Sequence, residues 1–334
     1  MKAGKLSESV LKRSVLRQLH TVRPELETGP GVGQDYSSIR LQDGKNMVHA
    51  VSTMPLSAPV AVEATVYNAL NNLVCSGAEP VGILVNLLLP TASTEQQLRD
   101  MICGIDVLCA KENLAVLGGH TEVVRAVTEP VLTVTAVGSL DPSVCVNVSR
   151  VKPGMDILVT KWVGLLGTAL LAENYEEELL TRYAGPFITQ AKRFRDYMSV
   201  RSEAAVAVQS GVCAMHDISE GGIYGALWEM GQGSGVGLEI DLKQIPIRQE
   251  TIEICEFFDV NPYKLLSTGS LLMAAEDGNA VVRAIRQAGG EAAVIGKATD
   301  SNDRVLLCED ERRFLETTQT DELWEFNKKK EIAK

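Results

Sequence analysis

Two glycines followed by three polar side chains make residues 114–122, Leu-Ala-Val-Leu-Gly-Gly-His-Thr-Glu, the segment best suited to meet a ligand. Glycine lets the backbone approach a ligand closely and adopt dihedral angles that a Cβ atom forbids. We interpret the apolar run as a buried strand that ends at Gly118 and Gly119, so that the imidazole, hydroxyl and carboxylate groups that follow lie at the strand end. The alternative is a sharp turn after a strand, without a ligand.

Length and charge limit the classes of protein to which the chain can belong. A chain of 334 residues exceeds one ordinary core, so we expect two domains. The net charge of −11 argues against a nucleic-acid surface, whereas a metal–nucleotide complex stays compatible because cations offset phosphate charge. No stretch has the roughly 18 apolar residues of a membrane span. The N-terminus lacks an apolar signal core and the seven cysteines form no Cys-x-x-Cys pair, so we expect a cytoplasmic protein that contacts no membrane.

Hydrophobic periodicity predicts two domains, residues 1–150 and 151–334, that meet at the Pro-Gly-containing segment 149–154. The first begins with a helical pattern from Ser7 to about His20 and continues as β-β-α-β-α-β, a sheet with its helices on one face. Its strands are expected at 36–41, 47–53, 81–89 and 131–140 and its helices at 60–75 and 94–111, with Asp43-Gly44 in the hairpin turn. The second half alternates strands (156–160, 236–240, 271–275, 292–295) with helices (164–174, 203–210, 222–230, 280–287) and ends in a charged tail, 325–334, that we expect to fray.

Several segments, in a fixed order, are similar to the ATP-binding superfamily of aminoimidazole ribonucleotide (AIR) synthetase, the hydrogenase maturation factor HypE, thiamine-monophosphate kinase and selenophosphate synthetase. Relatives have Gly-Asp-Asp-Ala-Ala-Val, Ser-Thr-Asp-Pro, Val-Asn-Asp-Leu with Gly-Ala-x-Pro, and Gly-Asp-Thr or Gly-Gly-His/Glu-Thr at four places. The corresponding segments here are Gly33–Ile39, Ser52–Pro55, Leu70–Leu73 with Ser76–Pro80, and Gly118–Glu122. Met215–Gly222 and Ala292–Ala298 match as well, and together the matches identify the chain as a member, nearest to the HypE-like, AIR synthase-related branch.

The resemblance implies a PurM-like two-domain α/β (α+β) fold. Its N-terminal mixed sheet has helices on one face and pairs with a second copy into a dimeric barrel, and its C-terminal domain is an α/β sandwich. It also implies a site for ATP or ADP with Mg²⁺ near the dimer interface. We assign catalysis to Asp35, His120 and Asp217, and metal binding to Asp35, Glu122 and Asp217. Nucleotide contacts are assigned to Gln34, Thr53, Asn71, Asn72, Gly118, Gly119, Thr121, Lys161, Gly221 and Gly222.

The chemistry of a triphosphate explains these residue types. Divalent cations that screen the phosphates prefer carboxylate oxygens from several chain segments. The γ-phosphoryl group can then pass in line to an acceptor, with positioning and electrostatics supplying most of the catalysis. Gly221 and Gly222 open a helix whose N–H groups can face an anion.

The chain departs from the family pattern at its acids. Gln34 replaces the acid before Asp35, Met54 replaces the second acid and Asn72 the third. A thioether is a poor ligand for Mg²⁺, and an amide offers a neutral oxygen. The loss of two charges should weaken metal binding unless Glu122, Asp217 or Glu220 compensates.

Each residue also has a structural interpretation. Asp35 can cap a turn, and His120 can be a hydrogen-bonded structural histidine. Asp217 can N-cap the following helix, which does not exclude contact with a ligand. Met54 is expected to serve packing. Lys161 either reaches a phosphate as a point charge or is solvated.

Two functions remain open. The first is a Mg-ATP-dependent, phosphoryl-activating enzyme of HypE-like type, a ligase, dehydratase or phosphotransferase with an unknown acceptor or partner protein. HypE dehydrates a thiocarbamoyl group on its own C-terminal cysteine, whereas the last cysteine here is Cys308, so we do not expect that step. The second is a catalytically weakened nucleotide-binding or regulatory protein that kept the fold, which Met54 and Asn72 favour.

Overall fold

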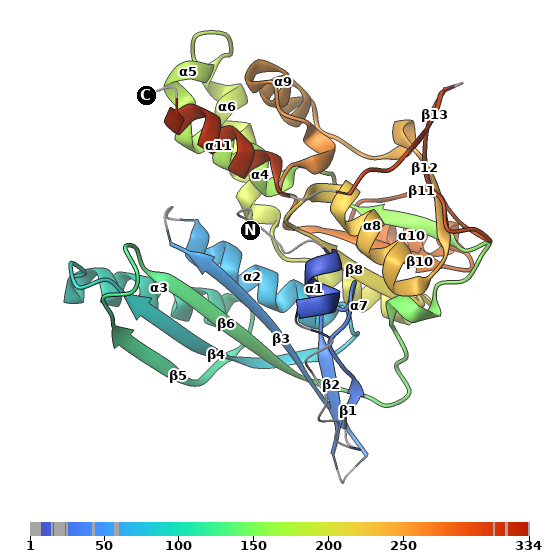
Figure 1. Cartoon of the computed structure of the whole chain (residues 1–334), viewed down its shortest axis with the longest axis horizontal. Coiled ribbons are helices and arrows are strands. Elements are labelled where there is room, and N and C mark those ends of the chain that lie inside the picture. The colour runs from blue at the N-terminus through green and yellow to red at the C-terminus, as the bar shows by residue number, and fades with distance from the viewer. Residues whose placement is uncertain are drawn as a thin grey trace. The chain divides into compact units, whose positions relative to one another are not determined.

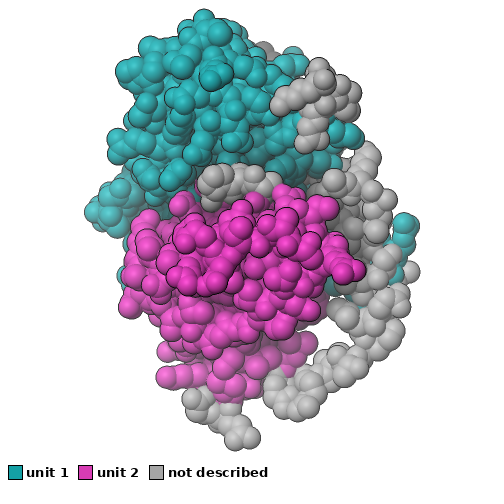
Figure 2. Space-filling view, turned by 90° about the vertical axis from the view of Figure 1, so that its left-hand side faces the viewer, with its two compact units in different colours: residues 1–22, 31–34, 146–334 teal, residues 23–30, 35–145 magenta. Residues whose placement is uncertain are grey.

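The computed structural model describes residues 8–14, 16, 24, 26–41, 44–56, 60–309, 311–317 and 320–332, which form two compact units. The N-terminal unit is formed by described residues of 23–30 and 35–145, and the C-terminal unit by those of 1–22, 31–34 and 146–334 (Figure 2). Each unit has its own sheet and helices (Figure 1). In the described part of the chain, no helix is long and apolar enough to cross a membrane.

The N-terminal unit is built on a six-stranded mixed sheet. Its strands are β1 (Leu26–Thr28), β2 (Ser37–Arg40), β3 (Asn46–Pro55), β4 (Glu79–Leu89), β5 (Ala115–Val123) and β6 (Val131–Leu140), and its helices are α2 (Ala61–Val74) and α3 (Glu95–Lys111). The strand order is β1-β2-β3-β6-β4-β5, and every pair is antiparallel except β4 and β5. Burial alternates along β3, β4 and β6, so one face of the sheet is covered; α2 packs on β3 and β6, and α3 packs on β5.

Local signals in the sequence explain where α3 begins and which face it buries. The Thr94 side chain accepts from the Gln97 backbone N–H, and the Gln97 side chain accepts from the Thr94 backbone N–H, a reciprocal capping box. Ile105, Leu108 and Cys109 form the buried side of the helix. The predicted helix at 94–111 is confirmed.

The opposite face of this sheet and the edge strand β5 are open. Every residue of β5 is exposed. Several large apolar side chains on the strands of this sheet are exposed to water, each by 41–59%: Val51, Val81, Leu84, Val116, Leu117 and Val123. Val51 and Leu84 share the open face, because both lie opposite Thr135 of β6, and exposed apolar side chains gathered on a sheet face are typical of interaction surfaces.

The C-terminal unit is built on a seven-stranded sheet with the order β13-β12-β9-β11-β7-β10-β8, in which only β12 and β9 are parallel. The strands are β7 (Asp156–Thr160), β8 (Ala214–Ile218), β9 (Gly237–Asp241), β10 (Ser270–Ala275), β11 (Ala292–Thr299), β12 (Arg304–Cys308) and β13 (Glu311–Phe314). The helices are α1 (Glu8–Ser14), α4 (Leu165–Asn174), α5 (Glu176–Leu179), α6 (Gly185–Lys192), α7 (Arg201–Gln209), α8 (Gly222–Ser234), α9 (Gln249–Phe258), α10 (Gly278–Gln287) and α11 (Glu322–Ile332). Short 3₁₀ helices lie at Val148–Arg150, Arg193–Tyr197, Leu242–Gln244 and Pro262–Lys264.

Strands β8 and β10 are buried at every residue, so both faces of the sheet are covered at these two strands. The helix α8 packs on β8, β9 and β10, and α10 packs on β7 and β11. Branched and aliphatic side chains fill the space between α8 and the sheet, among them Ile157, Ile223 and Leu227.

The structure corrects the expectation for the C-terminal tail. Residues 322–332 form α11, with Leu323 and Phe326 buried, whereas the charged composition of 325–334 predicted a frayed tail. Only part of the predicted N-terminal helix, Glu8–Ser14, lies in the described residues, and Asp43 of the predicted hairpin turn lies outside them.

Candidate functional site

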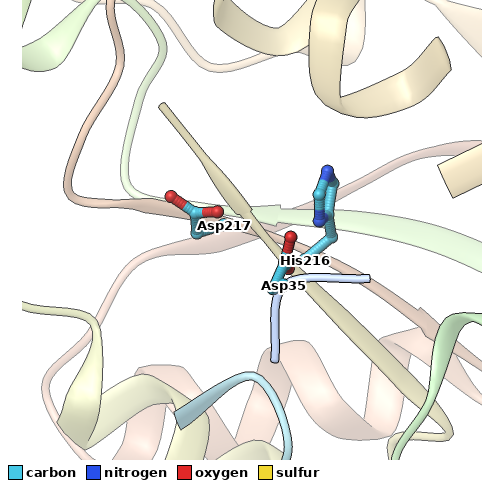
Figure 3. A group of neighbouring side chains, drawn as sticks. All are labelled: Asp35, His216 and Asp217. Atoms are coloured by element: carbon cyan, nitrogen blue, oxygen red, sulfur yellow. The ribbon is translucent and has the colours of Figure 1, made fainter. Parts of the chain in front are cut away.

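Two carboxylates and an imidazole come together near the end of β8 (Figure 3). Asp35, His216 and Asp217 each offer one possible metal ligand atom, and these atoms lie within 4.8 Å of one another. His216 and Asp217 are buried residues of β8. Asp35 is joined by one peptide bond to Gln34 of the C-terminal unit. Carboxylate oxygens suit Mg²⁺, and an imidazole is a ligand that transition metals accept as well.

Glu229 of α8 is positioned to orient the imidazole of His216. Its Oε2 lies 2.9 Å from Nε2 of His216, which is only 2% exposed. When a carboxylate accepts from one ring nitrogen, the other nitrogen keeps its lone pair, the usual arrangement of a metal-bound histidine. His216 is not among the site residues predicted from the sequence, although its place beside Asp217 in the Met-His-Asp motif was a usable signal.

Gln34, the residue in place of a family acid, is engaged with Asn147. Nε2 of Gln34 donates to Oδ1 of Asn147, and Nδ2 of Asn147 donates to Oε1 of Gln34, both at 3.3 Å. Both residues belong to the C-terminal unit. This reciprocal amide pair holds the segment that precedes Asp35.

The glycine pair at the start of α8 meets groups of its own chain. Gly221 is the N-cap, with a φ of 87°, and its N–H donates to Oδ2 of Asp321 at 2.7 Å. Gly222 has a φ of 60°, and a Cβ atom there would lie 2.5 Å from the carbonyl oxygen of Tyr263. The interpretation of Asp217 as the N-cap of this helix is wrong, because Asp217 lies within β8 and Gly221 occupies the cap.

Lys161 is buried and its ammonium group is fully engaged. Nζ donates to the carbonyl oxygens of Ser199 and Gly269 at 2.7 and 2.9 Å, and it lies 2.9 Å from Oε1 of Glu203. Burial lowers the pKa of Lys161, and the charge of Glu203 opposes that shift. An ammonium group has three protons, and these three partners account for them. The structure therefore places the Lys161 side chain in a buried ion pair, neither solvated nor directed at open space.

A row of polar side chains crosses the open face of the N-terminal sheet. Thr53 of β3 pairs with Thr133 of β6, Thr133 with Asn86 of β4, and Asn86 with His120 of β5. Residues directly opposite on neighbouring strands share a face. The hydroxyl oxygens of Thr53 and Thr133 are 3.0 Å apart, and Nε2 of His120 lies 3.2 Å from Oε2 of Glu122. Asn86 and Thr133 are not among the site residues predicted from the sequence, although each is a polar residue inside an apolar run.

The sequence predicted a buried strand that ends at Gly118 and Gly119. The structure contradicts this prediction. Strand β5 continues through Gly118 and Gly119 and is exposed throughout. The backbone at Gly119 does approach a neighbour closely, but that neighbour is strand β4: a Cβ atom on Gly119 would lie 1.9 Å from the carbonyl oxygen of Val85. The requirement for glycine at residue 119 thus comes from strand pairing.

The asparagine pair of α2 divides between core and surface. Asn71 is buried and Asn72 is half-buried. The thioether sulfur of Met54 in β3 lies 3.7 Å from Nδ2 of Asn68, which donates to it one helical turn before Asn72. The thioether therefore packs against α2, as expected.

The structure separates the predicted site residues into groups. Asp35 and Asp217 come together with His216, and Thr53 shares a row with His120. Strands β3, β6 and β4 lie between β2, which follows Asp35, and β5, a separation of roughly 19 Å at about 4.8 Å per strand. Thr121 and Glu122 lie on β5 with His120.

Comparison with known proteins identifies the family. The N-terminal domain of AIR synthase related proteins matches residues 33–140, and their C-terminal domain matches residues 152–309. The chain belongs to the AIR synthase related family, and its two sheets with their helices form the PurM-like two-domain fold.

Its relatives place it near the HypE proteins. A protein of Methanocaldococcus jannaschii named for hydrogenase expression and formation is 25% identical over 319 residues, 91% of each chain. The carbamoyl dehydratase HypE of Cupriavidus necator is 24% identical over 279 residues, 80% of this chain and 77% of the relative. The crystal structure of the hydrogenase maturation protein HypE in complex with ATP has a TM-score of 0.71 at 16% identity, over 96% of this chain and 97% of HypE.

Proposed function

We propose that this chain binds ATP or ADP with Mg²⁺ and acts as a Mg-ATP-dependent, phosphoryl-activating enzyme of HypE-like type in the cytoplasm, on an acceptor or partner protein that its sequence does not identify. The observation that carries the proposal is the group of Asp35, His216 and Asp217, whose ligand atoms lie within 4.8 Å of one another. The fold supports it, because a HypE with the same fold was solved with ATP. Free thiols at all seven cysteines support the location.

The donor set fits a divalent cation. Asp35 and Asp217 would hold the ion through carboxylate oxygens, and His216 would complete or orient that set. A bound cation would screen the phosphate charges and make the terminal phosphoryl group accessible to an acceptor. Glu229 would keep His216 in one tautomer.

The second candidate function is nucleotide binding without turnover. The observation that favours it is the neutral set at the family's acid positions: Met54 contacts Asn68, and the Gln34 amide pairs with Asn147. An ionised carboxylate at residue 34 could accept from Asn147 but not donate to it, so the reciprocal pair needs the neutral amide.

Nucleotide binding predicts a thermal shift. ATP in 100-fold excess over its Kd should stabilise the native protein by about 2.7 kcal/mol and raise the Tm, and Mg²⁺ should increase the effect. Differential scanning fluorimetry with ATP and ADP, with and without Mg²⁺, measures it. Asp35→Asn and Asp217→Asn should each remove the Mg²⁺-dependent part.

Glu311→Gln is the matched control, because it neutralises an exposed acid on β13. It should keep the full shift. Phosphate release under the same conditions separates the two functions, because an enzyme releases phosphate above background and a binder does not. An unchanged Tm at millimolar nucleotide in all conditions would contradict both functions.

We further propose that the open sheet face of the N-terminal unit pairs with a second copy of the chain, as the family resemblance implies. Strand β5 is exposed along its length, and the exposed face carries Val51 and Leu84 in one row with Thr135 between them. An uncovered apolar sheet face with an unpaired edge is a pairing surface.

Charge on this face should prevent pairing. Val51→Lys with Leu84→Lys should convert a dimer to a monomer in sedimentation equilibrium, because burying two lysines per copy without partners is costly. Val107→Lys on α3, where the native side chain is 67% exposed, is the control and should stay dimeric. A monomeric wild-type protein at micromolar concentration would rule out the pairing.

A further inference from the structure

The group of Asp35, His216 and Asp217 contains a nitrogen ligand, which distinguishes it from an ordinary Mg²⁺ site. Mg²⁺ prefers oxygen ligands and gives up its bound water molecules reluctantly. An imidazole nitrogen is instead a ligand that divalent transition-metal ions accept. His216 is 2% exposed and Asp217 is 6% exposed, so an ion that binds to both must lose part of its hydration shell. Both features disfavour Mg²⁺ relative to a transition-metal ion.

A carboxylate from another element lies behind the imidazole. Oε2 of Glu229 on α8 is 2.9 Å from Nε2 of His216, and the Glu229 side chain is 28% exposed. Histidines that bind metals usually donate one ring N–H to a carboxylate in this way, which fixes the ring and makes the other nitrogen a stronger ligand. Because Glu229 lies outside the group of three, this contact is a second observation that favours an ion with affinity for nitrogen.

Glu229 also supports the segment that carries Asp35. Gly33 has a φ of 71°, and a Cβ atom there would lie 2.5 Å from the carbonyl oxygen of Glu229. On the helix itself, a Cβ atom on Gly233 would lie 3.0 Å from the carbonyl oxygen of Val32. The main chain at Gly33 therefore packs directly on α8, two residues before Asp35. Glu229 thus contacts the imidazole with its carboxylate and the Asp35 segment with its main chain.

We propose that Asp35, His216 and Asp217 form a transition-metal site, which binds Mn²⁺ more tightly than Mg²⁺ and does so without nucleotide. The inference rests on the divalent cation assigned to this group under the proposed function, and it names the class of that ion. Mn²⁺ accepts the octahedral oxygen coordination of Mg²⁺, so a comparison of the two ions isolates the contribution of the imidazole. The protein would then hold the ion before a nucleotide arrives.

Mn²⁺ binding to the full chain without nucleotide tests the proposal. The electron paramagnetic resonance signal of free Mn²⁺ should fall as the ion binds, and Mg²⁺ should displace it only at a concentration at least about tenfold higher. His216→Gln exchanges the nitrogen ligand for a neutral oxygen, so it should reduce the preference for Mn²⁺ over Mg²⁺. A purely structural role of His216 would lower the affinity for both ions equally.

Glu229→Ala removes the carboxylate behind the imidazole and leaves the main chain that supports Gly33. Loss of such an orienting group typically weakens metal binding by roughly 10–100-fold, and we expect a loss of this size for Mn²⁺. His49→Gln is the matched control, because His49 is a half-buried histidine on β3 of the other unit. It should leave the affinities for both ions unchanged.

Two results would overturn the proposal: equal affinities of the wild-type protein for Mn²⁺ and Mg²⁺, or an unchanged preference in His216→Gln. Failure of this inference is distinct from failure of the proposed function, because the titration contains no nucleotide. A thermal shift with Mg-ATP but no preference for Mn²⁺ contradicts the inference alone. Preferential Mn²⁺ binding without any shift by nucleotide supports the metal site and contradicts the proposed function.

Discussion

Glu203→Ala should lower the free energy of unfolding by about 3–5 kcal/mol, because it leaves the buried ammonium group of Lys161 without its counter-charge. The two side chains are 9% and 7% exposed, and their charged atoms lie 2.9 Å apart. Urea unfolding at pH 7 measures the loss. Because burial lowers the pKa of Lys161, the folded variant binds fewer protons than the unfolded chain. The loss of unfolding free energy caused by Glu203→Ala should therefore become smaller as the pH rises toward about 10.

The matched control is the exposed pair of Arg99 and Glu95 on α3. These side chains are 68% and 77% exposed, with 2.6 Å between their charged atoms. Water and salt screen such a pair, so Glu95→Ala should cost less than about 1 kcal/mol. Similar losses for the two variants would show that burial does not govern the contribution of the Lys161 pair.

Local patterns predicted most of the elements. The apolar spacing and the Thr94 cap define α3, and a continuous apolar run defines β4. Strand β5 shows the limit of local reasoning, because an apolar run does not reveal whether its strand lies at an edge of a sheet. Exposure of β5 follows from the order β6-β4-β5, which depends on pairings between distant segments. For the same reason the charged composition of the tail concealed α11, whose buried residues contact other segments.

The candidate site was predicted in part, and mostly through motif order. Spacing along the chain could not bring Asp35 together with Asp217, because 181 intervening residues must first fold. His216 was missed because a histidine within a buried strand is usually a structural residue, although its place beside Asp217 was a usable signal. Lys161 resembled a phosphate ligand because it follows a strand; its partners Ser199, Glu203 and Gly269 all lie far along the chain.

The second large effect is expected at Gly222. Gly222→Ala should lower the free energy of unfolding by about 3–5 kcal/mol, through left-handed backbone strain and through overpacking. The φ is 60°, and a Cβ atom would lie 2.5 Å from the Tyr263 carbonyl oxygen and 2.9 Å from the backbone nitrogen and oxygen of Leu265. All three contacts are to backbone atoms and none is to a flexible side chain, so the backbone itself must shift.

Gly235, at the other end of α8, separates the two contributions. Its φ is 74°, and a Cβ atom there would have nothing within 4 Å. Gly235→Ala should therefore cost only the backbone strain, about 1–2 kcal/mol. Chemical unfolding of both variants without nucleotide gives the comparison. If Gly222→Ala costs no more than Gly235→Ala, the need for glycine at the start of α8 does not come from the close approach of the 263–265 backbone, and a ligand becomes the better explanation.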